Sequence, residues 1–187
     1  MKIVRQAARY EETIKKSRFI GEARPCQTER QALQFIQELH VLHPAASHIV
    51  YAYRILEPDG LICRFHDAGE PGGTAGKPIF HHLEGKRLIN AALAIIRYFG
   101  GVKLGAGGLT RAYGGIARLT LEQAELAEYI EYAELRFTLD YAKMQAFEYH
   151  LKKLDGQIVA QDFADKIRLT VKLPRANSGE LNNFLED

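Results

Sequence analysis

The sequence predicts an α+β fold divided into two α/β sandwich domains, residues 1–130 and 131–187. Three observations predict it. Short apolar runs typical of strands alternate along the chain with runs at helical spacing. Hydrophobic residues make up 47% and charged residues 26% of the chain, so a real core can form. The length of 187 residues suits one large domain or two small ones, and a second series of strands and helices starts near Tyr129.

The first elements of the chain are a short strand at 16–23 and a helix that begins after Thr28. The pattern Thr28-x-x-Gln31 is a capping box, and Pro44 stops the helix. The helix carries apolar residues at helical spacing at Leu33, Ile36 and Leu39. A half-buried strand follows at 47–55, with one face formed by Ile49, Tyr51, Tyr53 and Ile55.

The middle of the first domain is a hairpin followed by two glycine-rich loops. The turn at 57–60 predicts that residues 61–65 return antiparallel to the preceding strand. After the loop 67–74, Thr74 is the expected N-cap of a short helix that runs through Leu83. The apolar run 91–99 reads as a central strand. The glycine-rich turn 100–108 then leads into a long helix, expected from about Leu109 to Ala127. That helix contains Gly114 and Gly115, which close packing on the sheet would explain.

The second domain has the predicted order β-α-β-β-α. Its first strand alternates through Phe137, Leu139 and Tyr141; its helix carries Phe147, Leu151 and Leu154. Two strands follow at 157–161 and 166–173. Ser178 is expected to cap a last helix with Leu181, Phe184 and Leu185. A ferredoxin-like unit needs one more strand, so this strand is absent or the sequence is a fragment.

Composition and charge restrict the function. The two cysteines, Cys26 and Cys63, fit a reducing cytoplasm, and no signal peptide or membrane span is visible, so we expect a soluble cytoplasmic protein without a membrane partner. Residues 1–128 hold 17 Lys and Arg against 13 Asp and Glu, whereas residues 129–187 hold 8 against 10. Within 61–119 the count is 8 basic against 3 acidic, and 12 of the 16 glycines lie there. This coincidence indicates either a solvated surface with many turns or an anion-binding surface.

Known nucleotide-binding and metal patterns do not fit. The phosphate loop fails because Pro71 replaces its first glycine and Pro78 its magnesium-binding hydroxyl residue. The dinucleotide pattern fails because Thr110 stands at its third glycine. No four-ligand set for zinc is visible, and we expect neither a metal nor a cofactor. Asp67 and Glu70 are candidates for a carboxylate pair in acid–base chemistry, or for capping backbone N–H groups in their loop.

The remaining candidate is a phosphate site at two helix starts. Both follow glycine-rich loops and have cations beside them, and the amino end of a helix favours anions. If the two helix starts converge, they form a cradle for phosphate. The residues assigned to it are Thr74, Gly76, Lys77, Arg97, Lys103, Gly105, Gly107, Gly108 and Arg111.

Four segments resemble the YigZ/IMPACT family. They are Lys15-Lys-Ser-Arg-Phe-Ile20, His43-Pro-Ala-Ala-Ser-His48 running on to Ala52-Tyr-Arg54, Asp67-Ala-Gly-Glu-Pro-Gly-Gly-Thr-Ala-Gly-Lys-Pro78, and the segment from Arg97 to Tyr113. The family usually has two aspartates before Gly-Glu-Pro, whereas here Asp67 is followed by Ala68.

The resemblance implies a first domain folded like domain four of elongation factor G, also described as like the second domain of ribosomal protein five. It implies a ferredoxin-like second domain, similar to domain five of that factor. Contact with RNA or the ribosome, and regulation of translation or a stress response, are the functions it implies. A protein-partner module, or an enzyme acting on a phosphate-bearing small molecule, stays as an alternative.

Overall fold

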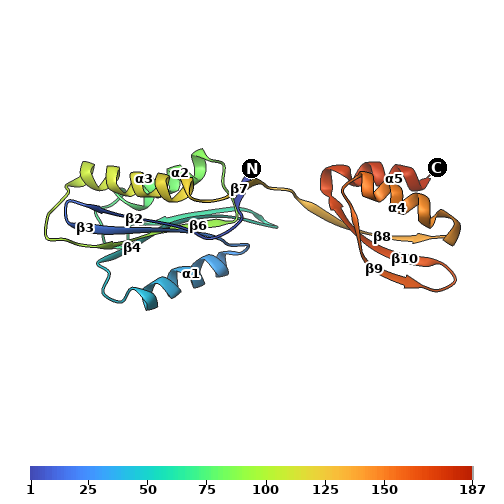
Figure 1. The fold of residues 1–187 in the computed structure, drawn as a ribbon, viewed down its shortest axis with the longest axis horizontal. Coiled ribbons are helices and arrows are strands. Elements are labelled where there is room, and N and C mark those ends of the chain that lie inside the picture. Colours follow the sequence, from blue (N-terminus) through green and yellow to red (C-terminus); the bar gives the residue numbers. More distant parts are fainter. Residues whose placement is uncertain (187) are drawn as a thin grey trace. The chain divides into compact units, whose positions relative to one another are not determined.

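The structure, a computed structural model, describes residues 1–186. The chain divides into two units, Met1–Tyr129 and Ile130–Asp187 (Figure 1). Each unit combines helices with an antiparallel sheet, so the predicted α+β class is confirmed. Within the described residues, no helix is both long enough and apolar enough to cross a membrane.

The first unit is built around one five-stranded sheet. Its elements are β1 (Lys2–Val4), β2 (Ala8–Ile14), β3 (Ser17–Pro25), α1 (Glu29–Leu42), β4 (His48–Glu57), β5 (Gly60–His66), α2 (Gly76–Gly85), β6 (Ala91–Tyr98), α3 (Ala106–Glu122) and β7 (Leu126–Glu128). The sheet has the antiparallel order β2-β3-β6-β4-β5, and β6 is its central strand as predicted. The short strands β1 and β7 pair separately and hold the start and the end of this unit together.

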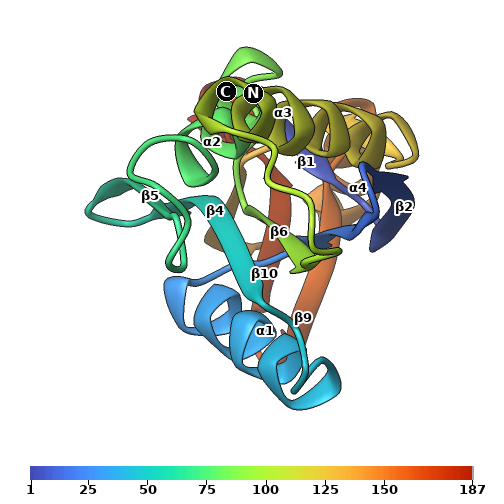
Figure 2. The same cartoon turned by 90° about the vertical axis from the view of Figure 1, so that its left-hand side faces the viewer.

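Helices cover both faces of this sheet. Figure 2 shows α1 on one side and α2 with α3 on the other. Alternate residues of β4 therefore enter two different cores, with Ile49 facing α1 and Val50 facing α2 and α3. The expectation of a half-buried strand at 47–55 was wrong, because helices bury both faces of β4. The same sandwich explains why β6 is apolar almost throughout.

Helix α1 begins as the capping pattern predicts. The Oγ1 of Thr28 accepts a hydrogen bond from the backbone N–H of Gln31 at 3.2 Å. The side chain of Gln31 accepts from the backbone N–H of Gln27 at 2.6 Å, one residue before the N-cap. Leu33 is 48% exposed, so the buried stripe is formed by Ala32, Phe35, Ile36 and Leu39. Of the three apolar residues noted at helical spacing, Ile36 and Leu39 belong to this buried stripe and Leu33 does not.

Helix α3 ends earlier than predicted and packs through a different glycine. It stops at Glu122, and Leu126 belongs to β7 instead of the helix. A Cβ on Gly115 would meet no atom within 4 Å, and one on Gly114 would meet α2 side chains, not the sheet. The close approach of α3 to the sheet is made by Gly21 of β3, where a Cβ would overlap Thr120 Oγ1.

The second unit has the predicted β-α-β-β-α order. Its elements are β8 (Tyr132–Leu139), the 3₁₀ turn η1 (Tyr141–Lys143), α4 (Met144–Lys153), β9 (Gln157–Phe163), β10 (Ile167–Pro174), the 3₁₀ turn η2 (Arg175–Asn177) and α5 (Ser178–Glu186). The three strands form an antiparallel sheet in the order β8-β10-β9.

Two details of the second unit differ from expectation. Tyr141 lies in η1, beyond the end of the strand. Ser178 is the first residue of α5, and its hydroxyl donates to the carbonyl of Arg175 at 2.7 Å instead of accepting from the helix. Leu181 is buried as predicted, whereas the side chains of Phe184 and Leu185 lie outside the described residues.

Candidate phosphate-binding site

A hollow of about 350 Å³ lies at the amino end of α3 in the first unit. Segments far apart in the sequence form it: the start of β4, the loop after β5, the end of β6 and the loop before α3. The lining residues are His48, Glu70, Pro71, Arg97, Phe99, Lys103, Leu104, Gly105, Ala106 and Leu109. We call this hollow the α3 pocket.

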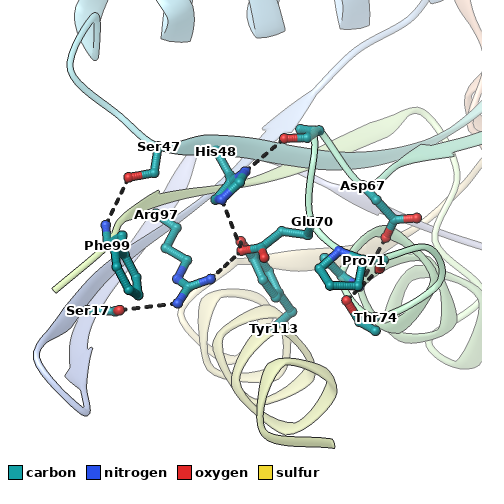
Figure 3. A network of polar contacts seen from close by, with 12 residues as sticks. Ser17, Ser47, His48, Asp67, Glu70, Pro71, Thr74, Arg97, Phe99 and Tyr113 are labelled. Carbon is teal, nitrogen blue, oxygen red and sulfur yellow. Dashed lines mark hydrogen bonds and ion pairs between the residues drawn. The ribbon is translucent and has the colours of Figure 1, made fainter. Parts of the chain in front are cut away.

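A buried polar network forms one wall of the α3 pocket (Figure 3). The Oε1 atom of Glu70 accepts hydrogen bonds from Arg97 Nη1 at 2.6 Å and from the hydroxyl of Tyr113 at 2.7 Å. The Glu70 and Arg97 side chains are only 4% and 5% exposed. Burial, and then the bond to Glu70, raises the pKa of Tyr113 far above its ordinary value, so this tyrosine stays a donor. The network ties the loop after β5 to β6 and α3, and thereby fixes the shape of the pocket.

The guanidinium of Arg97 also contacts the start of the neighbouring strand, β3. Its Nη2 donates to the Oγ of Ser17 at 3.3 Å, and the same oxygen accepts from the backbone N–H of Gly100 at 3.2 Å. The guanidinium carbon lies 5.4 Å from the ring centres of both Phe19 and Phe99. Because Glu70 neutralises its charge, Arg97 holds the pocket together more than it adds positive charge to it.

His48 approaches the network from β4. Its Nδ1 lies 2.9 Å from the carbonyl oxygen of Ala68, which can only accept, so Nδ1 carries a proton. Its Nε2 lies 3.8 Å from Glu70 Oε1, close enough for an ion pair when the ring is protonated. The His48 side chain is 24% exposed against 4% for Glu70, so it is the more accessible of the two from the pocket.

Asp67 holds the start of α2. Its Oδ1 accepts from the backbone N–H groups of Ala75 at 3.0 Å and Gly76 at 2.8 Å, and its Oδ2 accepts from Gly73 at 2.9 Å. Partial burial raises the pKa of Asp67, but the three N–H groups lower it more, so the pKa lies below its ordinary value. The amino end of α2 is thus already occupied by a carboxylate of the chain itself.

The predicted N-cap of α2 was wrong. The structure has Ala75 at that position, without a capping side chain, and the Thr74 hydroxyl instead donates to the carbonyl of Pro71 at 2.6 Å. Gly76 is needed at the next position because a Cβ there would lie 2.9 Å from the backbone of His66. Thr74 and Gly76 therefore shape the loop, and their contacts are internal.

The amino end of α3, in contrast, is open. Its N-cap is Gly105, which has no side chain, and its first residues Ala106, Gly107 and Gly108 leave their N–H groups without a protein acceptor among residues 1–186. Gly105 and Ala106 line the α3 pocket, and the exposed side chain of Lys103 lies beside them. Free N–H donors, the positive end of a helix dipole and a lysine together favour an anion.

The structure brings part of the predicted cradle together. Arg97, Lys103 and Gly105 of the cradle line the α3 pocket, together with Glu70, one of the two candidate carboxylates. Lys77 lies in a neighbouring hollow of about 330 Å³, which is lined by Gly73, Lys77, Pro78, His81, His82, Thr110 and Gly114. Arg111 is exposed on α3 and lines neither hollow; its Nη1 would lie 3.5 Å from a Cβ on Gly107.

Sequence reasoning did not assign a site role to His48, Phe99 or Tyr113. All three fall inside the segments that resemble the IMPACT family, and this resemblance was the signal that could have found them. Phe99 follows the central strand and is 49% exposed, which is unusual beside a buried arginine. In the part of the chain that the structure describes, no three His, Cys, Asp or Glu side chains are grouped to hold a metal ion.

The fold and this pocket define a two-unit α+β protein with an open helix start in its first unit. Comparison with known proteins shows its family. Residues 15–121 match the Impact N-terminal domain, and residues 137–187 match a domain of unknown function, DUF1949. The chain belongs to the IMPACT family.

Relatives match along most of the chain. An IMPACT family member of Thermus thermophilus is 36% identical over 166 residues, which are 89% of this chain and 89% of that protein. The IMPACT family member YigZ of Escherichia coli is 34% identical over 177 residues, 94% of this chain and 87% of that protein. A crystal structure described as that of a hypothetical protein has a TM-score of 0.72 at 33% identity, covering 98% of this chain and 90% of that one. The resemblance predicted from the four segments is confirmed.

Proposed function

We propose that this protein is an RNA-binding regulatory protein, and that the α3 pocket holds a phosphate of the RNA. The observation that carries the proposal is the open amino end of α3, where three successive N–H groups have no acceptor in the described chain and Gly105, Ala106 and Lys103 line the hollow. The phosphate backbone contributes most of the affinity of such complexes, and helix starts with a nearby cation bind it well.

The composition of the pocket fits RNA better than an isolated inorganic anion. Phe99 is half exposed at the pocket edge and offers an aromatic face next to the phosphate position. Bases of single-stranded RNA stack on such rings, while the phosphates follow the cations. Membership of the IMPACT family is consistent with this proposal, because the resemblance to that family implied contact with RNA or the ribosome.

Two observations favour binding over catalysis. Asp67 uses both carboxylate oxygens to hold backbone N–H groups, and Glu70 is buried against Arg97 and Tyr113. A general base needs free access to the proton that it removes, whereas both Asp67 oxygens and the Oε1 atom of Glu70 are already occupied by donors of the protein. His48 is the titratable side chain of the network with access to the pocket.

The test is RNA binding by Lys103→Gln, with Arg30→Gln as a matched control. Both side chains are exposed, but Arg30 lies on α1, on the opposite face of the sheet. We expect Lys103→Gln to weaken binding and to reduce the magnitude of the log–log salt slope by about 0.7, the value for one lost phosphate contact on a single strand. Fluorescence anisotropy with a labelled oligouridine, at several salt concentrations, measures both. Equal effects of the two substitutions, or binding that does not depend on salt, would contradict the proposal.

A further inference from the structure

The sheet of the second unit has both of its helices on one face. Alternate strand residues such as Leu169 and Val171 are buried against Phe147 of α4 and Leu181 of α5. Figure 1 shows α4 and α5 on the same side of β8, β10 and β9. Within the described part of this unit, the opposite face of the sheet carries no helix.

Two arginines and two threonines form the centre of that uncovered face. In the antiparallel register, Arg136 of β8 lies opposite Thr170 of β10, and Thr138 lies opposite Arg168. The two arginines are therefore diagonal neighbours, which places their Cα atoms roughly 7–8 Å apart. All four residues line a shallow hollow of about 340 Å³.

The charge of these arginines is poorly neutralised by the protein. Arg168 Nη1 lies 4.0 Å from Asp162 Oδ2, and both side chains are about two thirds exposed or more, at 73% and 68%, so water screens the pair. The Arg136 guanidinium makes no hydrogen bond or ion pair with any residue in the described range. One step along β10, the Lys172 ammonium lies 5.3 Å from the ring centre of Tyr132.

These cations cluster on one face although the unit as a whole has more acidic than basic residues. Residues 129–187 hold 8 basic and 10 acidic residues, yet three of the eight cations, Arg136, Arg168 and Lys172, lie on this one face, against two carboxylates, Glu134 opposite Lys172 and Asp162 opposite Arg168. Arg136 and Arg168 repel each other as diagonal neighbours, and an anion bound between them would relieve that repulsion. The arrangement is therefore suited to an anionic ligand.

We propose that this face, defined by Arg136, Thr138, Arg168 and Thr170, binds the phosphate backbone of single-stranded RNA. Each guanidinium offers a planar fork of donors that matches phosphate oxygens, and the two threonine hydroxyls add donors between the forks. An uncovered sheet face holds an extended strand with its phosphates along the cations. The choice of RNA rests on the function proposed above, whereas the site lies in a different unit and is tested separately.

The experiment compares three full-length chains with the unmodified protein. The first carries Arg136→Gln and Arg168→Gln. The second carries Lys152→Gln and Lys153→Gln on α4, which removes the same charge from the same unit on the helical side of the sheet. The third carries Lys103→Gln. Anisotropy of a labelled oligouridine of about 20 nucleotides, long enough for several contacts, is measured against salt.

The arginine variant should bind several-fold more weakly at low salt, with the salt slope reduced in magnitude by about 1.4, or 0.7 for each lost contact. The α4 variant should bind like the unmodified chain. An arginine variant that binds like the α4 variant overturns this inference; if Lys103→Gln weakens binding in the same series, the function proposed for the α3 pocket survives. Weakening by the arginine variant alone supports this face and contradicts the α3 pocket.

Two further outcomes also decide the question. Loss of polyglutamate binding in the arginine variant, with oligouridine binding unchanged, would assign the face to an acidic protein partner and overturn the RNA proposal. An unmodified chain that binds no oligouridine even at low salt overturns both proposals. Thermal unfolding of each variant checks that these exposed substitutions leave the fold intact.

Discussion

At the scale of single residues, Asp67 connects the fold to the site. Its carboxylate accepts three backbone N–H groups and so occupies the start of α2. Of the two helix starts assigned to the cradle, the start of α3 is therefore the one that is still open to a ligand. Ala68, the next residue, has a positive φ of 50°, and its carbonyl accepts from His48. The loop therefore orients the His48 side chain in the pocket and also caps the amino end of α2.

We expect Asp67→Ala to lower the free energy of unfolding by about 1–2 kcal/mol, because loss of a capping side chain has that effect. Asp67→Asn retains one acceptor oxygen and should lose less. Urea unfolding followed by circular dichroism measures both values. If Asp67→Ala were as stable as the unmodified chain, the three hydrogen bonds would make no net contribution to the free energy of unfolding.

The pH dependence of this contribution has a definite sign. The pKa of Asp67 lies below its ordinary value of 3.8, so the ionised carboxylate stabilises the folded state above that pH. The stabilisation disappears as the pH falls through the folded-state pKa. The difference in unfolding free energy between Asp67→Ala and the unmodified chain should thus shrink in acid. If this difference in unfolding free energy grew in acid instead, the lowered pKa assigned to Asp67 would be contradicted.

The sequence revealed this region but not its contacts. Composition and spacing predicted the glycine-rich loop and its candidate carboxylates. Capping of backbone N–H groups was one of the two interpretations of Asp67 and Glu70. Thr74 was chosen as the N-cap because capping usually comes from the adjacent residue. The actual acceptor is Asp67, nine residues before Gly76, and only the folded loop brings it there. The partners of Glu70 could not be predicted from the sequence either, because Arg97 and Tyr113 lie 27 and 43 residues away along the chain.

At the scale of elements, the packing of α3 on the sheet depends on Gly21. A Cβ at this position would overlap Thr120 Oγ1 and lie 3.0 Å from Ile116 Cγ2. Thr120 is fully buried, and its hydroxyl donates to the carbonyl of Ile116 at 2.7 Å, so it has little room to move. The absence of a side chain at Gly21 thus sets how closely α3, and with it the pocket, approaches β3.

Gly21→Ala should destabilise the protein by about 2 kcal/mol, the middle of the range for overpacking a close-packed core. Adding Thr120→Ala should recover part of the loss, and the coupling appears in a double-mutant cycle. Gly115→Ala is the control: its Cβ meets open space within a helix, so stability should rise by up to about 1 kcal/mol. Strictly additive effects at residues 21 and 120 would argue against the contact.

Most elements could be predicted from apolar periodicity, and the failures have physical causes. Strands β1, β2 and β7 were not predicted: β1 and β7 are only three residues long, and β2 is an edge strand with mainly exposed polar residues. The long helix was extended to Ala127 because Leu126 falls near its stripe, although Leu126 packs from β7 instead. The strand at 47–55 was taken as half buried because tyrosines alternate there. A second covering helix layer cannot be inferred from one strand.

At the scale of the whole molecule, the chain consists of two units with separate cores and different charge. The first unit has two core layers around its sheet, and the second has one. The basic, glycine-rich segment 61–119 lies entirely in the first unit and contains the α3 pocket. The second unit adds a smaller cationic face on its uncovered sheet. The two proposals therefore assign the main RNA contact to the first unit and an additional one to the second.

The most direct test of the central claim is an amide NMR titration of the full chain with a short oligouridine. Binding of phosphate at the amino end of α3 should shift the amide signals of Ala106, Gly107 and Gly108 most strongly, because their N–H groups would donate to it. Amides of α1, on the other face of the sheet, should stay unchanged. Saturating shifts at residues 106–108 that weaken with added salt are the predicted result. Saturating shifts elsewhere, with these three amides unmoved, would contradict the account.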